Sequence, residues 1–181
     1  GMGMLSSMGC YGNCSFCSYF SKDGFKTHSI ESIISELDYL SYYVGGNITP
    51  ISFFDDCFSV STERTIDLCE RIKVNNYNFQ FWCCTRADLL NEDVIDLIAE
   101  CGFKNIVIGL ESASIDVFSK IGKVNPDYSA IDYLENIKRI YKYAVKKEIN
   151  PLLSVNFGLP FEKLPDATKT IQFLKDNYVV D

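Results

Sequence analysis

The sequence predicts an α/β fold built on a parallel β-sheet. Short apolar runs of strand type alternate with longer stretches of helical periodicity throughout the 181 residues, and no repeat or linker interrupts them. Five strand–helix units in succession imply a parallel sheet, because each helix returns the chain to the edge at which the next strand starts. The hydrophobic fraction of 47% is ample for the core of one domain.

The first half of the chain contains three predicted strands and two predicted helices. A short strand near 4–8 runs into a cysteine-containing loop at 9–17, which we call the cysteine loop. The helix after this loop has its apolar residues at helical spacing, at Ile30, Ile33, Ile34, Leu37 and Leu40. A Gly-Gly pair ends that helix, and the apolar run 51–54, bounded by a proline and two aspartates, predicts a buried strand. A helix at 62–75 and a strand at 79–84 follow.

The second half repeats this alternation. Asn91 is expected to cap a helix that has two acidic residues in its first turn, where they face the positive end of the helix dipole, and Gly102 ends it. The remaining predicted elements are a strand at 104–110, a helix at 128–148, a strand at 152–157 and a helix at 165–177.

Three cysteines are the most informative local feature. Cys10, Cys14 and Cys17 have the spacing Cys-x3-Cys-x2-Cys, and thiolates that close together can converge on one soft metal centre. A closed zinc site takes four ligands, whereas three thiolates on an iron–sulfur cubane leave one of its four irons open. Gly9 and Gly12 allow the loop to turn tightly. The spacing therefore favours a cluster that presents one vacant coordination position.

Two other interpretations of these cysteines remain open at this point. Cys14 and Cys17 alone have the spacing of a redox dithiol, although such a motif has no third cysteine so near. A zinc site would need a fourth ligand, and the candidates are His28, the only histidine, or one of the cysteines that are remote in sequence.

Polar residues follow the predicted strands. The cysteine loop follows the first strand, Asp55 and Asp56 the second, Arg86 the third, Glu111 the fourth, and a Gly-Leu-Pro turn at 158–160 the fifth. Ligands of parallel sheets bind at the carboxyl ends of the strands. The five segments are therefore expected to meet at one site.

Composition indicates a reduced, cytoplasmic protein. Five of the eight cysteines lie outside the triplet in hydrophobic segments, where reduced cysteine packs as a small apolar residue. No apolar run approaches the roughly 20 residues that span a bilayer. The net charge of −7 argues against a surface that coats nucleic acid, although it leaves room for a local basic groove.

The chain resembles the radical S-adenosylmethionine superfamily over nearly its whole length. The triplet is that family's signature, with an aromatic residue, here Phe16, before the third cysteine. Four further segments match in order, at 53–58, 84–88, 109–112 and 156–162. The Asp-Asp-x-Phe and Thr-Arg-Ala-Asp segments are most similar to the branch of cobalamin-dependent methylases, methylthiotransferases and anaerobic cyclases.

The resemblance implies a partial (β/α)6 TIM-like barrel that is truncated after about five βα units, with a sixth strand expected after Asp181 or beginning near 178–180. Residues 1–181 would form one core domain, part of a longer protein. The implied cofactors are a 4Fe-4S cluster and S-adenosylmethionine, with cobalamin on a domain outside this chain. The implied partners are an unknown substrate and a one-electron donor such as a flavodoxin or ferredoxin.

The implied activity is reductive cleavage of S-adenosylmethionine to a 5′-deoxyadenosyl radical. The outcome would be abstraction of hydrogen from an unknown substrate or methylation of that substrate. The resemblance also implies an oxygen-sensitive enzyme. Methylation, methylthiolation, cyclisation and peptide modification stay unranked. The alternatives are a non-catalytic iron–sulfur or zinc module, and an interaction domain that has lost its cofactors.

The resemblance also assigns site residues. Cys10, Cys14 and Cys17 would be the cluster ligands, and Phe16 would lie near the adenine. Asp55 and Asp56 stand where relatives commonly have Gly-Gly-Glu, so either carboxylate is a candidate acceptor for the methionine ammonium.

Four further residues complete the expected set. Arg86 would hold the methionine carboxylate, or form an internal ion pair with Asp55, Asp56 or Glu111. Glu111 would meet the ribose hydroxyls or the ammonium. Lys123 would meet the cofactor carboxylate, with a solvated side chain as the alternative, and Asn156 would line the pocket. No catalytic residue is assigned.

Overall fold

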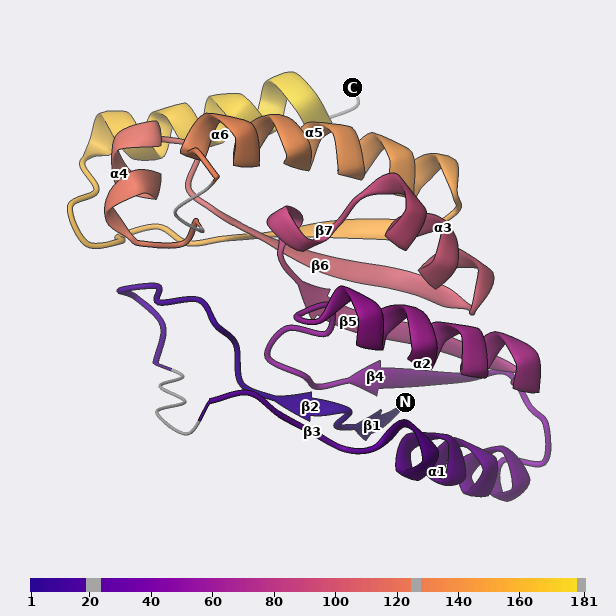
Figure 1. Ribbon diagram of the computed structural model, residues 1–181. Helices are drawn as coiled ribbons and strands as arrows, with labels where there is room; N and C mark the ends of the chain where they lie inside the picture. Colours follow the sequence, from indigo (N-terminus) through magenta and orange to yellow (C-terminus); the bar gives the residue numbers. More distant parts are fainter. Residues whose placement is uncertain (19–23, 125–127, 179–181) are drawn as a thin grey trace.

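The computed structural model describes residues 1–18, 24–124 and 128–178, and its main sheet has five parallel strands. Figure 1 shows their order, which is β1 (Met2–Met4), β4 (Thr49–Phe53), β5 (Phe79–Thr85), β6 (Phe103–Glu111) and β7 (Asn150–Val155). All four neighbouring pairs are parallel, which confirms the expected sheet. Within the described ranges the sheet does not close into a barrel.

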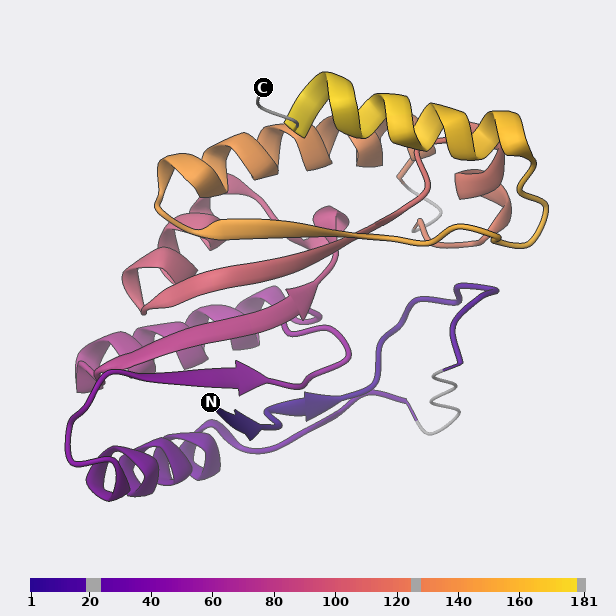
Figure 2. The ribbon, with the colours of Figure 1, turned by 180° about the vertical axis from the view of Figure 1, so that it is seen from behind.

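Helices connect the strands and cover one face of the sheet. They are α1 (Ile30–Tyr43), α2 (Thr62–Asn75), a 3-10 turn η1 (Ala87–Leu89), α3 (Glu92–Glu100), α4 (Ile115–Lys120), α5 (Ala130–Lys146) and α6 (Leu164–Tyr178). Figure 2 turns the opposite face toward the viewer, where β4 to β7 lie in front of α2, α3 and α5. None of the helices in the described ranges is long and apolar enough to span a membrane.

Polar caps set several helix starts. Asn91 accepts a hydrogen bond from the Val94 N–H, as expected. The helix expected from residue 128 starts at Ala130, because Ser129 and Asp132 form a reciprocal capping box there.

Two expectations about strands are corrected. The run 4–8 is not one strand: β1 ends at Met4, and Ser7–Met8 form a separate strand, β2, which pairs antiparallel with β3 (Lys26–Thr27). The cause is the buried Asp55 carboxylate, which binds Ser6 and Ser7 and so draws the chain out of the main sheet. The sixth strand does not begin at residue 178, since Tyr178 ends α6; residues 179–181 lie outside the described residues.

The core lies between the sheet and its helices. Alternate residues of β5 face this layer and are buried, while Trp82 and Cys84 face the other side and are half-buried. Phe53 is the centre of an aromatic cluster, with ring centroids 4.9 Å from Phe58, 5.5 Å from Phe81 and 5.8 Å from Phe103. The two faces of the sheet therefore differ: one is closed by packing and the other stays available at its carboxyl end.

Tyr133 of α5 braces two strand ends. Its buried hydroxyl donates to the Gly109 carbonyl of β6 at 2.8 Å and accepts from the Ala87 N–H after β5 at 3.2 Å. Asn136, one turn further on, donates to the Ala87 carbonyl at 2.5 Å. These bonds hold the end of β6, which carries Glu111, beside the segment after β5, which carries Arg86.

We predict that Tyr133→Phe lowers the free energy of unfolding by about 1–3 kcal/mol, because the Ala87 N–H and the Gly109 carbonyl lose a buried partner. Urea unfolding of the metal-free protein measures the change. Tyr42→Phe is the control, since Tyr42 is 87% exposed on α1. Equal stability of the two variants would contradict the bracing role.

Candidate functional site

A cavity of about 230 Å³ lies at the carboxyl ends of the strands. The cysteine loop forms one wall, and the ends of β5, β6 and β7 form the others. Eight of the ten expected site residues line it: Cys10, Cys14, Phe16, Cys17, Asp56, Arg86, Glu111 and Lys123. Four of the five segments expected to meet at one site contribute to this cavity, and the Gly-Leu-Pro turn at 158–160 does not line it. Asp55 and Asn156 do not line the cavity.

Backbone contacts dock the cysteine loop against the sheet. The Gly9 N–H donates to the Asp56 carboxylate at 2.7 Å, and the Ser15 N–H donates to the Ile121 carbonyl at 2.8 Å. Gly9 has a positive φ of 102°, and a Cβ there would lie 2.8 Å from the Gly24 carbonyl oxygen. The loop therefore needs glycine at this position.

The donor set fits an iron–sulfur cluster. The three thiols line one cavity, and the Gly12 N–H donates to Cys10 Sγ at 3.3 Å. A Cβ on Gly12 would lie 3.4 Å from Cys10 Sγ and 3.6 Å from Cys14 Sγ, which is ordinary van der Waals contact, so Gly12 lies next to both sulfurs. Within the described residues no three His, Cys, Asp or Glu side chains converge closely enough to hold one metal ion. A cubane does not require such convergence, because each thiolate binds a different iron.

Cys10 has the environment of a thiolate. The pKa of Cys10 is lowered to about 6, mainly by a hydrogen bond with the buried Cys57. Burial of Cys10 opposes this shift. The Gly12 N–H and the cations Arg86 and Lys123 lower the pKa further. Burial raises the pKa of Cys14. Metals bind the thiolate form of cysteine, so a lowered pKa suits Cys10 to the ligand role expected for it.

The two aspartates after β4 have different environments. Asp55 is buried, and its carboxylate accepts from the Ser6 N–H at 2.7 Å, the Ser6 hydroxyl at 2.5 Å and the Ser7 hydroxyl at 2.6 Å. These bonds fix the start of the cysteine loop. Asp56 is exposed and lines the cavity, with one oxygen taken by the Gly9 N–H. Of the two acids, Asp56 has the position of a ligand contact.

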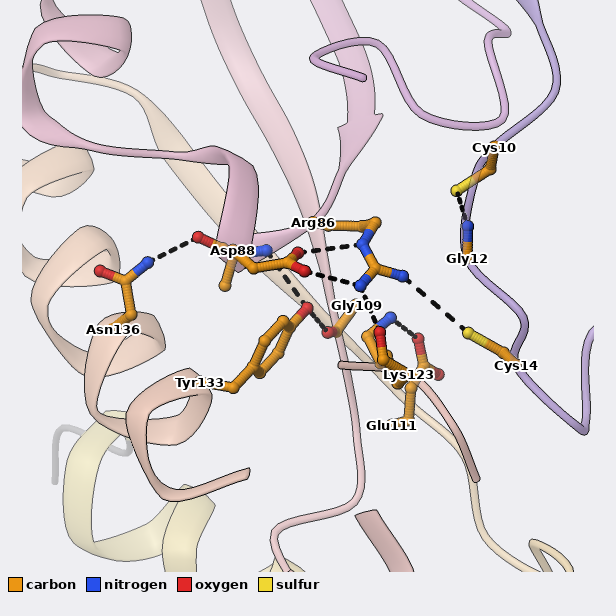
Figure 3. Close-up of polar contacts among 11 residues, drawn as sticks. Cys10, Gly12, Cys14, Arg86, Asp88, Gly109, Glu111, Lys123, Tyr133 and Asn136 are labelled. Atoms are coloured by element: carbon orange, nitrogen blue, oxygen red, sulfur yellow. Dashed lines mark hydrogen bonds and ion pairs between the residues drawn. The ribbon is translucent and has the colours of Figure 1, made fainter. Parts of the chain in front are cut away.

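Arg86 is paired with Asp88, which sequence reasoning did not select as a partner (Figure 3). Its Nε donates to Asp88 Oδ1 at 2.9 Å and its Nη2 to Asp88 Oδ2 at 2.7 Å. Nη2 also donates to the Lys123 carbonyl, and Nη1 lies 4.0 Å from Cys14 Sγ. Burial alone would lower the pKa of Arg86, but the ion pair with Asp88 raises it above the usual value. Arg86 is therefore a permanent, buried cation beside the cysteine loop.

Glu111, Lys123 and Asn156 form the second polar group of the site. Glu111 Oε1 accepts from Lys123 Nζ at 2.9 Å, and Oε2 accepts from Asn156 Nδ2 at 2.5 Å. Lys123 is thus an ion-pair partner and not a solvated side chain. Asn156 reaches the site through Glu111, although it does not itself line the cavity.

The backbone around Glu111 is unusual. Glu111 has a positive φ of 61°, and the register of β6 with β7 shifts between Gly109 and Glu111. A Cβ on Gly109 would lie 2.5 Å from both Glu111 Oε1 and Lys123 Nζ, so glycine makes space for the pair. Strained backbone beside a ligand cavity is a common property of functional sites.

Sequence reasoning missed several contributors. Asp88 follows Arg86 by two residues in a segment already singled out, and this Arg-x-Asp spacing was the available signal. Gly109 belongs to the segment 109–112 that resembles the family, but the space that it leaves for the ion pair was not predicted. Tyr133 carried no signal that separates it from an ordinary core residue. The cavity is also lined by side chains of the uncovered sheet face, from Cys84, Val107 and Ser154.

Known proteins identify the family. The family model of the Radical SAM superfamily matches residues 4–174. A curated relative, named an uncharacterised methyltransferase of Pyrococcus horikoshii, is 32% identical over 174 residues, which are 95% of this chain and 36% of that protein. The chain therefore spans about a third of the length of this relative.

Solved structures share the fold. The radical S-adenosylmethionine methyltransferase TsrM of Kitasatospora setae, with cobalamin and a [4Fe-4S] cluster bound, matches with a TM-score of 0.82 at 16% identity, over 96% of this chain and 34% of that one. The cobalamin-dependent S-adenosylmethionine radical enzyme OxsB matches with a TM-score of 0.77 at 20% identity, over 95% of this chain and 26% of that one. Because the family model covers nearly all of the residues around this cavity, the chain belongs to the radical S-adenosylmethionine superfamily.

Proposed function

We propose that residues 1–181 form the cofactor-binding core of a radical S-adenosylmethionine enzyme. Cys10, Cys14 and Cys17 would hold a 4Fe-4S cluster, and S-adenosylmethionine would occupy the adjoining cavity. The observation that carries the proposal is that all three thiols line the same cavity as Glu111 and Lys123. A donor set of three thiols beside a charged pocket suits a cluster that shares its open iron with a second ligand.

The bound cofactors would supply one-electron cleavage of the sulfonium and the radical chemistry that follows from it. The protein binds and orients them. Glu111 keeps unused lone pairs on both carboxylate oxygens, so it can accept from the ammonium or from a ribose hydroxyl. Asp56 is a second acceptor for the ammonium, and Lys123 supplies positive charge for the methionine carboxylate. Phe16, half-buried in the cavity wall, offers an apolar contact for the adenine.

We further propose methylation as the reaction. The support is the name of the Pyrococcus relative and the methyltransferase TsrM among the structural neighbours. Cobalamin, which TsrM and OxsB carry, would be bound outside the residues described here. The uncovered sheet face beside Val107 would receive the substrate, and an external one-electron donor of the flavodoxin or ferredoxin type would reduce the cluster. A reducing cytoplasm suits these cofactors and the buried thiols.

Replacing any one of Cys10, Cys14 and Cys17 by alanine should abolish release of 5′-deoxyadenosine from S-adenosylmethionine, because the cluster loses a ligand. The measurement is chromatography of the products after anaerobic reconstitution and reduction with dithionite. Cys69→Ala is the control, since this buried thiol lies on α2 away from the cavity. If the wild type takes up iron and sulfide but never releases the nucleoside, the chain is a non-catalytic iron–sulfur module.

Glu111→Gln should weaken binding of S-adenosylmethionine, because a hydrogen bond to a charged group contributes about 1.5–3 kcal/mol, or roughly 10- to 100-fold in Kd. Isothermal titration of the reconstituted protein measures the affinity, and iron analysis measures the cluster. Iron content should stay unchanged, since Glu111 belongs to a different segment from the cysteines. Glu70→Gln, at an exposed position of α2, is the control. An unaltered Kd in the Glu111 variant would remove this residue from the binding site.

Air should bleach the visible absorbance of the reconstituted protein within a single exposure, because the vacant iron faces an open cavity. Absorbance spectra before and after aeration test this. Visible absorbance that survives air unchanged would contradict an exposed cluster iron, whereas a protein that develops no visible absorbance on reconstitution would favour zinc.

A further inference from the structure

We propose that Arg86 acts on the iron–sulfur cluster and not on the methionine carboxylate: its guanidinium stabilises negative charge on the cluster side of the cavity and raises the reduction potential of the cluster. Asp88 is the positioning residue that aims this cation. The inference rests on the proposed function, because it requires a cluster on Cys10, Cys14 and Cys17.

Arg86 has no pair of parallel N–H groups left to bind a further carboxylate. Nε and one N–H of Nη2 form the bidentate pair with Asp88, and the second N–H of Nη2 is given to the Lys123 carbonyl. Both side chains of the pair are buried, with 6% and 3% of their surface exposed. A carboxylate recognised by arginine usually takes two parallel N–H groups. Only Nη1 remains, so a bidentate grip on S-adenosylmethionine would require breaking a buried ion pair.

The remaining nitrogen of the guanidinium, Nη1, points toward the cysteine loop. Nη1 lies 4.0 Å from Cys14 Sγ, and in Figure 3 Asp88 and Cys14 lie on opposite sides of the guanidinium. The Arg86 Cζ also stands 5.4 Å from the centroid of the Tyr11 ring, within the cysteine loop. The guanidinium of Arg86 therefore lies between the thiol of Cys14 and the carboxylate of Asp88 that neutralises its charge.

Gly12 of the cysteine loop lies directly against the guanidinium of Arg86. A Cβ on Gly12 would lie 2.7 Å from Arg86 Nη1. The end of a flexible arginine could normally move aside, but Asp88 and the Lys123 carbonyl hold this one in place. The guanidinium therefore favours glycine at position 12.

The electrostatic consequence follows from burial. A charge interaction is several times stronger in a partly buried site than in water, because the effective dielectric constant is lower. Reduction adds one negative charge to a cluster, and a fixed cation beside a ligating thiolate stabilises the reduced state. Net charge and hydrogen bonds to the sulfurs are known determinants of cluster potential. Arg86 would therefore make the electron transfer that starts the reaction easier.

The test compares Arg86→Gln with the double variant Arg86→Gln/Asp88→Asn, which removes both charges and leaves no unpaired buried carboxylate. The midpoint potential of each reconstituted protein is measured without S-adenosylmethionine, by redox titration monitored by electron paramagnetic resonance. Arg71→Gln is the matched control: it also removes one positive charge, at a half-exposed position on α2. Titration with S-adenosylmethionine is run separately on every variant.

We expect both Arg86 variants to have a more negative midpoint potential than the wild type and the Arg71 variant, with the single variant shifted further because Asp88 keeps its charge. Affinity for S-adenosylmethionine should change less than twofold in the double variant. An unchanged potential together with a large loss of affinity would overturn the inference and make Arg86 a carboxylate ligand. If the wild type releases 5′-deoxyadenosine but the Arg86 variants have the same midpoint potential as the wild type, this inference alone is overturned. If the wild type assembles no cluster, the proposed function is overturned as well.

Discussion

The parallel pairing of β4, β5, β6 and β7 is the constraint on which the rest of the structure depends. It brings residues that are distant in sequence to one edge of the sheet, so that Asp56, Arg86 and Glu111 border a single cavity. The cysteine loop has little regular structure of its own, and it is placed by bonds to this edge. The same pairing leaves one face of the sheet free of helices within the described residues, and that face continues into the cavity.

The buried charges at this edge are tolerated because each has ion-pair or hydrogen-bond partners. An unpaired ion in a buried position would cost several kcal/mol. Asp55 is satisfied by two serines, Arg86 by Asp88, and Glu111 by Lys123 and Asn156. The pairs differ in what they leave available. Asp55 is fully used for structure, whereas the carboxylate of Glu111 keeps acceptor capacity toward the cavity.

Sequence reasoning reached the strands of the main sheet, the long helices and most of the expected site residues, because periodicity and strand ends are local properties. It did not predict β3, η1 or α4, which are too short to show a hydrophobic period. It did not distinguish Asp55 from Asp56, since adjacent residues after a strand point in opposite directions and the choice depends on Ser6 and Ser7, far away in the chain. The partner of Arg86 was missed because long-range ion pairs were weighed against each other while the carboxylate two residues away was not. The split of the first strand depended on Asp55 in the same way.

Lys123 connects the two polar groups of the site. Its carbonyl accepts from Arg86, on the side proposed for the cluster, and its ammonium donates to Glu111, on the side proposed for S-adenosylmethionine. The neighbouring glycine has a positive φ of 67°, and a Cβ there would lie 3.0 Å from the Asn13 carbonyl of the cysteine loop. The segment around Lys123 therefore touches the loop, the cation and the carboxylate at once. Arg86 and Glu111 do not contact each other directly, but both are held by Lys123, so one residue fixes the spacing between the two polar groups.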